Sequence, residues 1–573
     1  MEILDITSDE LREKGYELKK EGSTMVLYYN GSFYRWSFYR NDFDRSTNKA
    51  DKTLSEKGLD RQIIEDVKTG MSKNYNELMK SEGAITTTKK QAEREQQQTL
   101  RMASKAIKSS CTMEEWKTAV EDKHQNLKKV ADEQIPGLWL PLEFTISIKC
   151  ILNISNITLP FIGIILGPPS SYKSVAVDSP KQARDTFYTD NFSPKSFVSH
   201  NSNMSEEELQ EMDLLPKIKN KLFLVPELAP LFTTREDELG HVLGIIMRIA
   251  DGNGYWSDTG SKGHRGYEGP LMFVWVGAAV DIPFKVHKML STLGPKLYFL
   301  RLPMIEEDEN TLLQSLQNED FPIRVRNVKQ ALYEYLETLE SCPSMEIDPK
   351  SGIPKLEWDS KDESNQEAQR YLIYLAELLA YLRGTVSTWE TEDGQGLEYA
   401  YASRNIEHPR RAITQLHNLC KGHALSQGRD YITVDDDLPL VVKVVLSGAA
   451  SIERVKVLNL LLSGTKGRLY TASDVAEAIG TSVKTAKRTM AEFKALGLVD
   501  LEELGNEGEP LIQIKLKDDL GWFFEPVFKK LKGDYMPGSF KQFLVKKGGV
   551  PKIPPTDTTY TFSSEQENDN NNE

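Results

Sequence analysis

FIGIILGPPSSYKS, residues 161–174, joins a short apolar run to a loop of small residues that ends in Lys173 and Ser174. Apolar runs of this length, bounded by turn residues, are typical of strands that are buried on both faces. Two more short apolar runs, Lys221 to Val225 and Leu271 to Gly277, follow at helix-length separations. The pattern predicts a parallel sheet covered by helices on both faces, and therefore an α/β fold.

The loop after the first apolar run matches most of a phosphate-binding P-loop. That motif has glycine at its first and sixth positions, followed by Lys and then Ser or Thr. Backbone N–H groups wrap the phosphates, the lysine reaches the β- and γ-oxygens, and the hydroxyl binds Mg²⁺. Tyr172 departs from the motif because it occupies the second glycine position, where the backbone normally has positive φ. A plain strand-to-helix turn is the alternative. The residues expected to bind ATP are Gly167, Pro168, Pro169, Ser170, Ser171, Tyr172, Lys173 and Ser174, with Ser174 holding Mg²⁺.

Three downstream motifs resemble the other parts of a P-loop ATPase site. An apolar run ends in Glu227, which we expect to orient the attacking water, although Pro226 stands where an Asp usually binds the metal. Asp281 follows the third apolar run, in the position of a polar sensor for the γ-phosphate. Arg410 and Arg411 open an amphipathic helix, and either is expected to reach the γ-phosphate from a helical lid. Taken singly, these residues also fit a surface acid and a solvated arginine pair.

In this order the motifs, over residues about 140 to 450, resemble an AAA+ ATPase, most closely the branch of the minichromosome-maintenance helicases. The resemblance implies ATP hydrolysis and a ring built from copies of the chain. That branch completes its site with an arginine from the neighbouring subunit. Lys296 lies near that position, so the resemblance leaves Arg301 as the substitute.

The likeness to that branch rests on residues 251–270, DGNGYWSDTGSKGHRGYEGP, which precede the third apolar run. Such helicases carry a DNA-contacting hairpin at this point. Bases stack on aromatic rings and phosphates pair with basic side chains, so Lys262, His264 and Arg265 are expected to contact DNA. A flexible surface loop without a ligand is the alternative.

Residues 447–518 have the pattern of a winged helix-turn-helix, with three helices followed by two strands around a Gly- and Glu-rich turn. The helices are expected at Ser451 to Ser463, Asp474 to Ile479 with Ser473 as its cap, and Ser482 to Leu496. The third helix is expected to bury one stripe, formed by Val483, Ala486, Met490 and Phe493. Its outer face then carries the expected DNA contacts, Lys484, Thr485, Lys487 and Arg488. Docking to a protein is the alternative, since winged helices also serve that role.

The chain is expected to contain seven segments. They are an N-terminal α/β domain (1–85) with a hairpin at Asn30-Gly31, a helical arm or linker outside the core (86–138), an AAA+-like ATPase core (139–305), a helical lid (306–446), the winged helix (447–518), a C-terminal extension (519–553) and a disordered acidic tail (554–573).

Composition narrows the function classes. The 573 residues include 71 Lys plus Arg against 85 Asp plus Glu, a net charge of −14, so nucleic acid must be met by a local basic patch. The four cysteines show neither zinc-site spacing nor the density of a disulfide scaffold. With no signal peptide or membrane span in the pattern, we expect a cytoplasmic protein.

These observations predict a DNA-associated AAA+-like ATPase, either a helicase-like motor or a DNA-remodelling factor. The alternative from another class is a DNA-binding regulator or scaffold with a nucleotide fold that does not hydrolyse ATP. A protein-remodelling ATPase is the third possibility, in which the winged helix serves as an adaptor.

Overall fold

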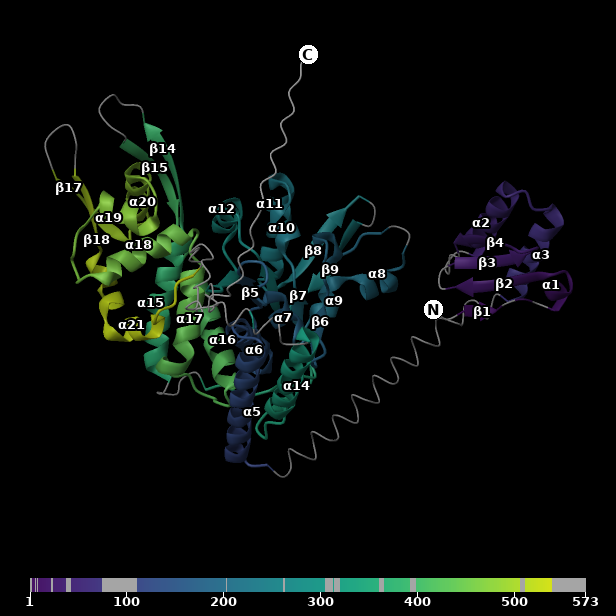
Figure 1. Cartoon of the computed structure of the whole chain (residues 1–573), viewed down its shortest axis with the longest axis horizontal. Helices are drawn as coiled ribbons and strands as arrows, with labels where there is room; N and C mark the ends of the chain where they lie inside the picture. The colour runs from purple at the N-terminus through teal and green to yellow at the C-terminus, as the bar shows by residue number, and fades with distance from the viewer. Residues whose placement is uncertain are drawn as a thin grey trace, which may run out of the picture. The chain divides into compact units, whose positions relative to one another are not determined.

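The computed structural model describes residues 3–5, 7, 9–21, 24–37, 43–74, 111–201, 204–260, 263–303, 313, 320–359, 365–391, 398–504 and 511–537 (Figure 1). The chain divides into two compact units, Met1–Ser110 and Cys111–Glu573. Lys262 and the expected tail at 554–573 lie outside the described residues. No helix in the described ranges is long and apolar enough to cross a membrane. All four cysteines are free thiols.

In its described residues, the first unit is a four-stranded antiparallel sheet with three helices, in the strand order β1-β2-β3-β4. Asn30 and Gly31 join β3 to β4 with φ values of 48° and 73°, so both residues of the turn are left-handed. This is the two-residue hairpin that Asn-Gly favours, and it confirms that expectation. The elements are β1 (Ile3–Asp5), α1 (Asp9–Glu13), β2 (Tyr16–Glu21), β3 (Thr24–Tyr29), β4 (Ser32–Ser37), α2 (Phe43–Glu56) and α3 (Arg61–Lys73).

The second unit is built on a five-stranded parallel sheet with the order β11-β5-β10-β7-β6. Alternate residues of each strand enter two different hydrophobic cores, as Ile165 and Ile164 of β5 show. Helices therefore cover both faces, which confirms the expected α/β class with a parallel sheet. The strands are β5 (Phe161–Leu166), β6 (Thr186–Tyr188), β7 (Leu222–Val225), β10 (Val274–Ala279) and β11 (Leu297–Arg301).

The two faces carry different sets of helices. The first face has α5 (Met113–Gln134), α6 (Trp139–Cys150), α7 (Lys173–Asp178), α14 (Phe321–Glu340), α15 (Gln366–Arg383), α16 (Arg410–Ser426) and α17 (Val434–Ser447) in its core. The second face has α9 (Leu214–Ile218), α10 (Ala229–Thr233), α11 (Glu236–Ile249) and α12 (Phe284–Leu293) in its core, with α8 (Glu206–Met212) nearby in the chain. Gly163 lets α6 approach the sheet closely, because a Cβ there would lie 2.4 Å from Ile148.

Residues 86–138 were expected to form an arm or linker outside the core, and helix α5 corrects that expectation for 111–138, the part of the segment that the structure describes. Thr112 makes the expected capping box with Glu115, but the helix then packs along α14. Trp116 is 1% exposed and donates from Nε1 to the carbonyl of Thr338 at 3.1 Å. The apolar residues of α5 are few but share one face of the helix. The helix is therefore buried along that face although most of its residues are polar.

The C-terminal module, which we define as residues 452–516, contains three helices and a three-stranded antiparallel sheet in the order β16-β18-β17. Thr471, and not Ser473, caps the second helix through a capping box with Asp474. Val483 is 45% exposed rather than buried, while Thr489 is buried beside Met490. The packed stripe of α20 therefore begins one turn later than expected. The elements are α18 (Ile452–Ser463), β16 (Tyr470–Thr471), α19 (Ala472–Ile479), α20 (Val483–Leu496), β17 (Val499–Leu504) and β18 (Leu511–Leu516).

Two further segments contact this module. The hairpin of β14 (Thr385–Thr391) and β15 (Glu398–Asn405) packs against α20, and Figure 1 shows the pair beside it. After β18 the chain forms η4 (Asp518–Phe524) and α21 (Pro526–Lys532), and α21 packs on α17.

Candidate functional site

The topology marks the carboxyl edge of the parallel sheet, beside β5 and β10, as the candidate ligand site. In open α/β sheets, ligands bind outside the carboxyl ends of strands at the point where the connections change direction. Helix α7, which follows β5, joins the core on the first face, whereas α12, which follows β10, joins the core on the second face. Leu166 and Ala279 are paired in register, so the loop after Leu166 and the residues after Ala279 leave the sheet side by side.

The loop that enters α7 has an unusual backbone at Tyr172. Its φ is 57°, in the left-handed region where the P-loop motif places glycine, and Ser170 also has a positive φ of 63°. Such a conformation costs a non-glycine residue about 1–2 kcal/mol. The tyrosine ring stacks on Phe321 with centroids 6.1 Å apart and packs against the first core. Those contacts offset the cost of the backbone.

Lys173 points back into the loop. Its Nζ donates to the carbonyl of Pro168 at 2.6 Å and to Ser171 Oγ at 3.2 Å, and the side chain is buried. Burial lowers the pKa of Lys173, and the negative charge of Glu227 partly opposes that shift. A buried ammonium held by neutral oxygens gains a stronger partner when an anion enters the loop. The hydroxyl of Ser174 lies one residue further on and is exposed.

Glu227 stands on the same edge of the sheet as Lys173. It follows β7, its Oε1 accepts from the backbone N–H of Ala229 at 2.8 Å, and it remains exposed. Lys173 follows β5 and Glu227 follows β7, the two parallel strands that flank β10, so the structure brings these two predicted residues to the same edge, where the charge of Glu227 acts on the Lys173 ammonium. Among the described residues no three His, Cys, Asp or Glu side chains form a metal-binding group. A Mg²⁺ ion in a P-loop takes most of its ligands from phosphate and water, and the sequence motif assigns one further ligand to the hydroxyl of Ser174.

Asp281 also lies at this edge, and it is paired with Arg301. Arg301 Nη1 contacts Asp281 Oδ1 at 2.6 Å, and that oxygen also accepts from the Ile282 backbone N–H at 2.8 Å. Arg301 is only 8% exposed. Its guanidinium therefore pairs within its own chain, and this corrects the expectation that it projects toward a neighbouring subunit.

Two hydroxyl groups that the sequence did not indicate hold the backbone of Arg301. Its N–H donates to Ser447 Oγ at 2.9 Å, and its carbonyl accepts from Tyr535 Oη at 2.6 Å. Ser447 and Tyr535 contact each other at 2.6 Å, which closes the ring of hydrogen bonds. Because β11 is an edge strand, these hydroxyls satisfy groups that a neighbouring strand would otherwise pair.

Arg411 lies at the opposite, amino edge of the sheet. It contacts Asp251 Oδ1 at 2.8 Å, and Lys296, which directly precedes β11, contacts the same oxygen at 2.7 Å. One turn later in α16, Gln415 donates to the carbonyl of Pro160, just before β5 begins. The expectation that Arg411 reaches the γ-phosphate from a lid in the same chain is therefore wrong, because α16 starts at the wrong edge. Arg410 is exposed and adjoins it there.

Strands β8 (Gly254–Thr259) and β9 (Gly263–Glu268) pair antiparallel as a β-hairpin, which excludes the alternative of an irregular loop for these residues. On one face of the hairpin, Trp256 and His264 stack with centroids 4.7 Å apart and planes 5° from parallel. Trp256 is 45% exposed, and His264 Nδ1 contacts Asp258 Oδ1 at 3.0 Å. This face presents an aromatic surface beside a histidine.

The other face of the hairpin is fixed to the protein. Arg265 Nη1 contacts the buried Asp213 at 2.7 Å and donates to the carbonyl of Ser199 at 2.6 Å. Tyr267 Oη also donates to Asp213, at 2.6 Å. Arg265 is thus committed to a structural ion pair, and the expectation that it contacts DNA does not fit its surroundings.

The predicted contacts on α20 do not share one open face. Arg488 and Thr485 line a cavity of about 490 Å³ between α20 and α12. Lys484 is exposed on the neighbouring stripe of the helix, and Lys487 is half-buried. The four residues are therefore divided between a cavity wall and the outer surface.

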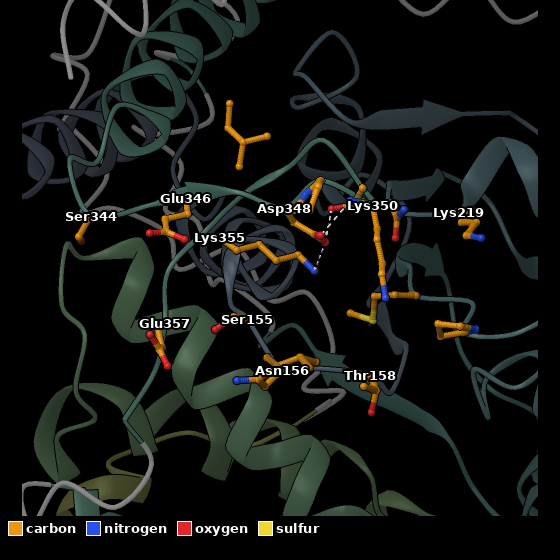
Figure 2. Close-up of a pocket in the computed structure, with 17 residues that line it drawn as sticks. Ser155, Asn156, Thr158, Lys219, Ser344, Glu346, Asp348, Lys350, Lys355 and Glu357 are labelled. Carbon is orange, nitrogen blue, oxygen red and sulfur yellow. Dashed lines mark hydrogen bonds and ion pairs between the residues drawn. The ribbon is translucent and has the colours of Figure 1, made fainter. Parts of the chain in front are cut away.

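A larger cavity, of about 950 Å³, lies at the amino edge of the sheet (Figure 2). Its walls come from the segments around Asn156 and Lys219 and from the short strands β12 (Glu346–Ile347) and β13 (Pro354–Lys355). Figure 2 shows Asp348 and Lys355 meeting there, with Lys355 Nζ 3.1 Å from Asp348 Oδ2. The Ser351 hydroxyl, the Lys350 N–H and Lys355 lower the pKa of Asp348 to about 2. No sequence motif marked this cavity, because separate segments build it.

Comparisons with known proteins add little. No protein-family model and no curated protein matches the chain. Among solved structures it is similar to one titled "The A form apo structure of NrS-1 C terminal region-CTR", with 10% identity and a TM-score of 0.22. The match covers 69% of this chain and 76% of that one. A TM-score this low carries no argument, so the site rests on its own geometry.

Proposed function

We propose that this chain is a DNA-associated AAA+-like ATPase whose loop at residues 167–174 binds the phosphates of ATP. The observation that carries the proposal is the convergence of Lys173, Glu227 and Asp281 at the carboxyl edge, beside the strand where the connections change direction. They come from three different strand ends, and the electrostatic influence of Glu227 on Lys173 supports a common site.

Each residue at this edge has a role in the proposal. Lys173 Nζ would exchange its contacts with Pro168 and Ser171 for phosphate oxygens, and Ser174 would contribute a hydroxyl ligand to Mg²⁺. Glu227 would orient the attacking water. Arg301 would supply positive charge near the γ-phosphate, since Asp281 alone repels it, and Asp281 would hold that guanidinium in place.

The association with DNA rests on two features. The exposed stack of Trp256 and His264 offers a surface on which bases stack. The C-terminal module has three helices and a three-stranded antiparallel sheet whose first strand, β16, lies between α18 and α19, and this arrangement supports the winged helix-turn-helix expected from the sequence. We also propose that identical subunits assemble into a ring, because the motifs in the sequence resemble those of AAA+ ATPases and that resemblance implies a ring.

Calorimetry with Mg-ATP tests the nucleotide site. The wild-type chain should bind Mg-ATP, and Lys173→Ala should remove the binding, because no other described lysine enters the loop. Lys129→Ala is the matched control, since that lysine is exposed on α5 and pairs loosely with Glu133 at 3.9 Å. Equal affinity in the Lys173→Ala and wild-type proteins would refute the assignment.

A second function, a DNA-binding scaffold that holds nucleotide without hydrolysing it, is favoured by one observation. Pro226 provides no carboxylate where the metal-side Asp usually stands, so Glu227 is the acid that directly follows β7. Steady-state ATP turnover with and without DNA separates the two functions. Mg-ATP binding without turnover in either condition identifies the scaffold.

A further inference from the structure

The cavity of about 490 Å³ lies between the parallel-sheet region and the C-terminal module. Helix α12 forms one wall and helix α20 the opposite one, while the starts of β14 and α18 complete it. The lining residues are Phe284, Lys288, Thr385, Val386, Ser451, Glu453, Arg454, Thr485, Arg488, Thr489 and Glu492.

Buried contacts hold these walls at a fixed separation. Arg454 is 1% exposed, and its Nη1 donates to the carbonyls of Leu382 and Gly384 at 2.6 Å each. Its Nη2 pairs with Glu492, so α18, α20 and the end of α15 are joined. On the other side, Ser291 of α12 contacts Thr385 of β14 through their hydroxyls at 2.7 Å. The cavity is therefore built into the fold.

The chemistry of the lining favours an anionic ligand with flat rings. Lys288 and Arg488 are exposed on opposite walls, and neither has an ion-pair partner among the described residues. Arg454 and Glu492 neutralise each other, which leaves Glu453 as the other acid in the described lining. Phe284 is 55% exposed at the rim. The hydroxyls of Thr385, Ser451, Thr485 and Thr489 add hydrogen-bonding groups.

We propose that this cavity binds single-stranded nucleic acid, with phosphates on Lys288 and Arg488 and a base stacked on Phe284. Sequence-independent binding of single strands combines cations along the backbone with aromatic rings under the bases. A duplex would have to admit α20 into its major groove, but the stripe of α20 with Thr485 and Arg488 faces α12 across the cavity. The inference rests on the proposed association with DNA and specifies which form of DNA is bound.

The cavity is also connected to the candidate nucleotide site. Asp281 precedes the first residue of α12, Phe284, by three positions, and the charges of Arg301 and Arg454 both act on His287 within that helix. A nucleic-acid strand bound on α12 would therefore lie near the Asp281–Arg301 pair, because only the short segment between Asp281 and Phe284 separates that pair from the helix.

Fluorescence anisotropy of the full chain with labelled oligo-dT, measured over a series of salt concentrations, tests the inference. Lys288→Ala/Arg488→Ala should weaken binding and flatten the log–log salt slope by about 1.4, because each phosphate contact with a single strand contributes about 0.7. Phe284→Ala should weaken binding about tenfold without changing the slope, since stacking releases no counterions. Arg326→Ala, an exposed charge on α14 that does not line the cavity, should change neither quantity.

Unchanged oligo-dT affinity and slope in the double variant would overturn the inference. So would a double variant that loses only duplex binding, because α20 would then dock on duplex DNA. Calorimetry with Mg-ATP distinguishes a failure of the single-strand site from a failure of the proposed ATP site, since the double variant should still bind Mg-ATP. A wild-type chain that binds ATP but no oligo-dT at low salt overturns the inference and leaves the ATP site standing.

Discussion

The two edges of the parallel sheet both gather charged residues, but they use the charges differently. At the amino edge, Asp251 is surrounded by Lys296 and Arg411, and every one of these charges has an opposite partner. At the carboxyl edge, Asp281 and Arg301 also pair, but the Lys173 ammonium is held only by neutral oxygens and Glu227 is exposed. Removing one member of an ion pair leaves its partner as an uncompensated charge, so such pairs affect the stability of the fold. A buried charge that contacts only neutral groups can still pair with a charged ligand. The comparison predicts that changes at paired clusters affect stability and that changes at the carboxyl edge affect binding.

The largest stability effect is expected at a paired cluster inside the helices of the first face. Burial alone would lower the pKa of His423, but its contacts with Asp437 at 2.7 Å and Glu143 at 3.6 Å raise the pKa to about 9. Because this pKa exceeds the ordinary value near 6.5, the stabilisation is complete below about pH 6.5 and is lost as the pH rises through 9. Urea denaturation should show a loss of about 2–3 kcal/mol between pH 7 and 10. His423→Gln should flatten that decline, and an equally steep decline in the variant would contradict the assignment.

A smaller loss of stability is expected from Asp251→Asn at the amino edge. The change leaves Lys296 and Arg411 beside each other without a counter-charge, and it should cost about 2 kcal/mol after allowance for the partial exposure of the cluster. Thermal or urea denaturation measures the loss. The affinity for Mg-ATP should stay unchanged. A reduced affinity in a folded variant would show that the amino edge also affects nucleotide binding.

The Asp251 carboxylate should also make the stability of the chain depend on pH in acid solution. Burial alone would raise the pKa of Asp251, but Lys296 and Arg411 outweigh burial and lower it. Its stabilisation is therefore present above the unfolded pKa of about 3.9 and is lost as the pH falls through the lower folded value. The difference in stability between wild type and Asp251→Asn should shrink below pH 4. A difference that stays constant down to pH 2 would show that the ion pairs are not its source.

The smallest effect on stability is expected at Tyr172, where two substitutions separate the strain of the backbone from the contact made by the ring. Tyr172→Ala keeps the strained backbone and loses the ring contact with Phe321, so it should destabilise the chain by about 1 kcal/mol. Tyr172→Gly loses the same contact but relieves the strain, so its stability should lie close to that of wild type. Urea denaturation compares the pair. Equal losses in both variants would mean that the backbone at this position carries no strain.

The parts of the fold that the sequence predicted are those set by local pattern. The apolar runs of β5, β7 and β10 and the turn at Asn30-Gly31 each carry their signal within a few neighbouring residues. The left-handed backbone of Tyr172 followed from its place in the motif. Helix α5 was misjudged because four buried residues among many polar ones give a weak stripe.

The parts that could not be predicted depend on contacts between distant segments. Arg411 looked suited to a lid, but the packing of α16 decides which edge of the sheet it meets. Tyr535 is 234 positions from Arg301, and no local pattern indicates that its hydroxyl closes the end of β11. The same holds for the cavity between α12 and α20, since its two cations belong to elements that only the folded chain brings together.

The proposed nucleotide site predicts that ATP binds at the carboxyl edge of the sheet and not at the amino edge. Calorimetry with Mg-ATP on Lys173→Ala and Arg411→Ala, each checked for folding by its thermal transition, compares the two edges directly. We expect Lys173→Ala to abolish binding and Arg411→Ala to bind Mg-ATP with the affinity of wild type. Retained binding in Lys173→Ala, or a loss of binding confined to a folded Arg411→Ala protein, would contradict it.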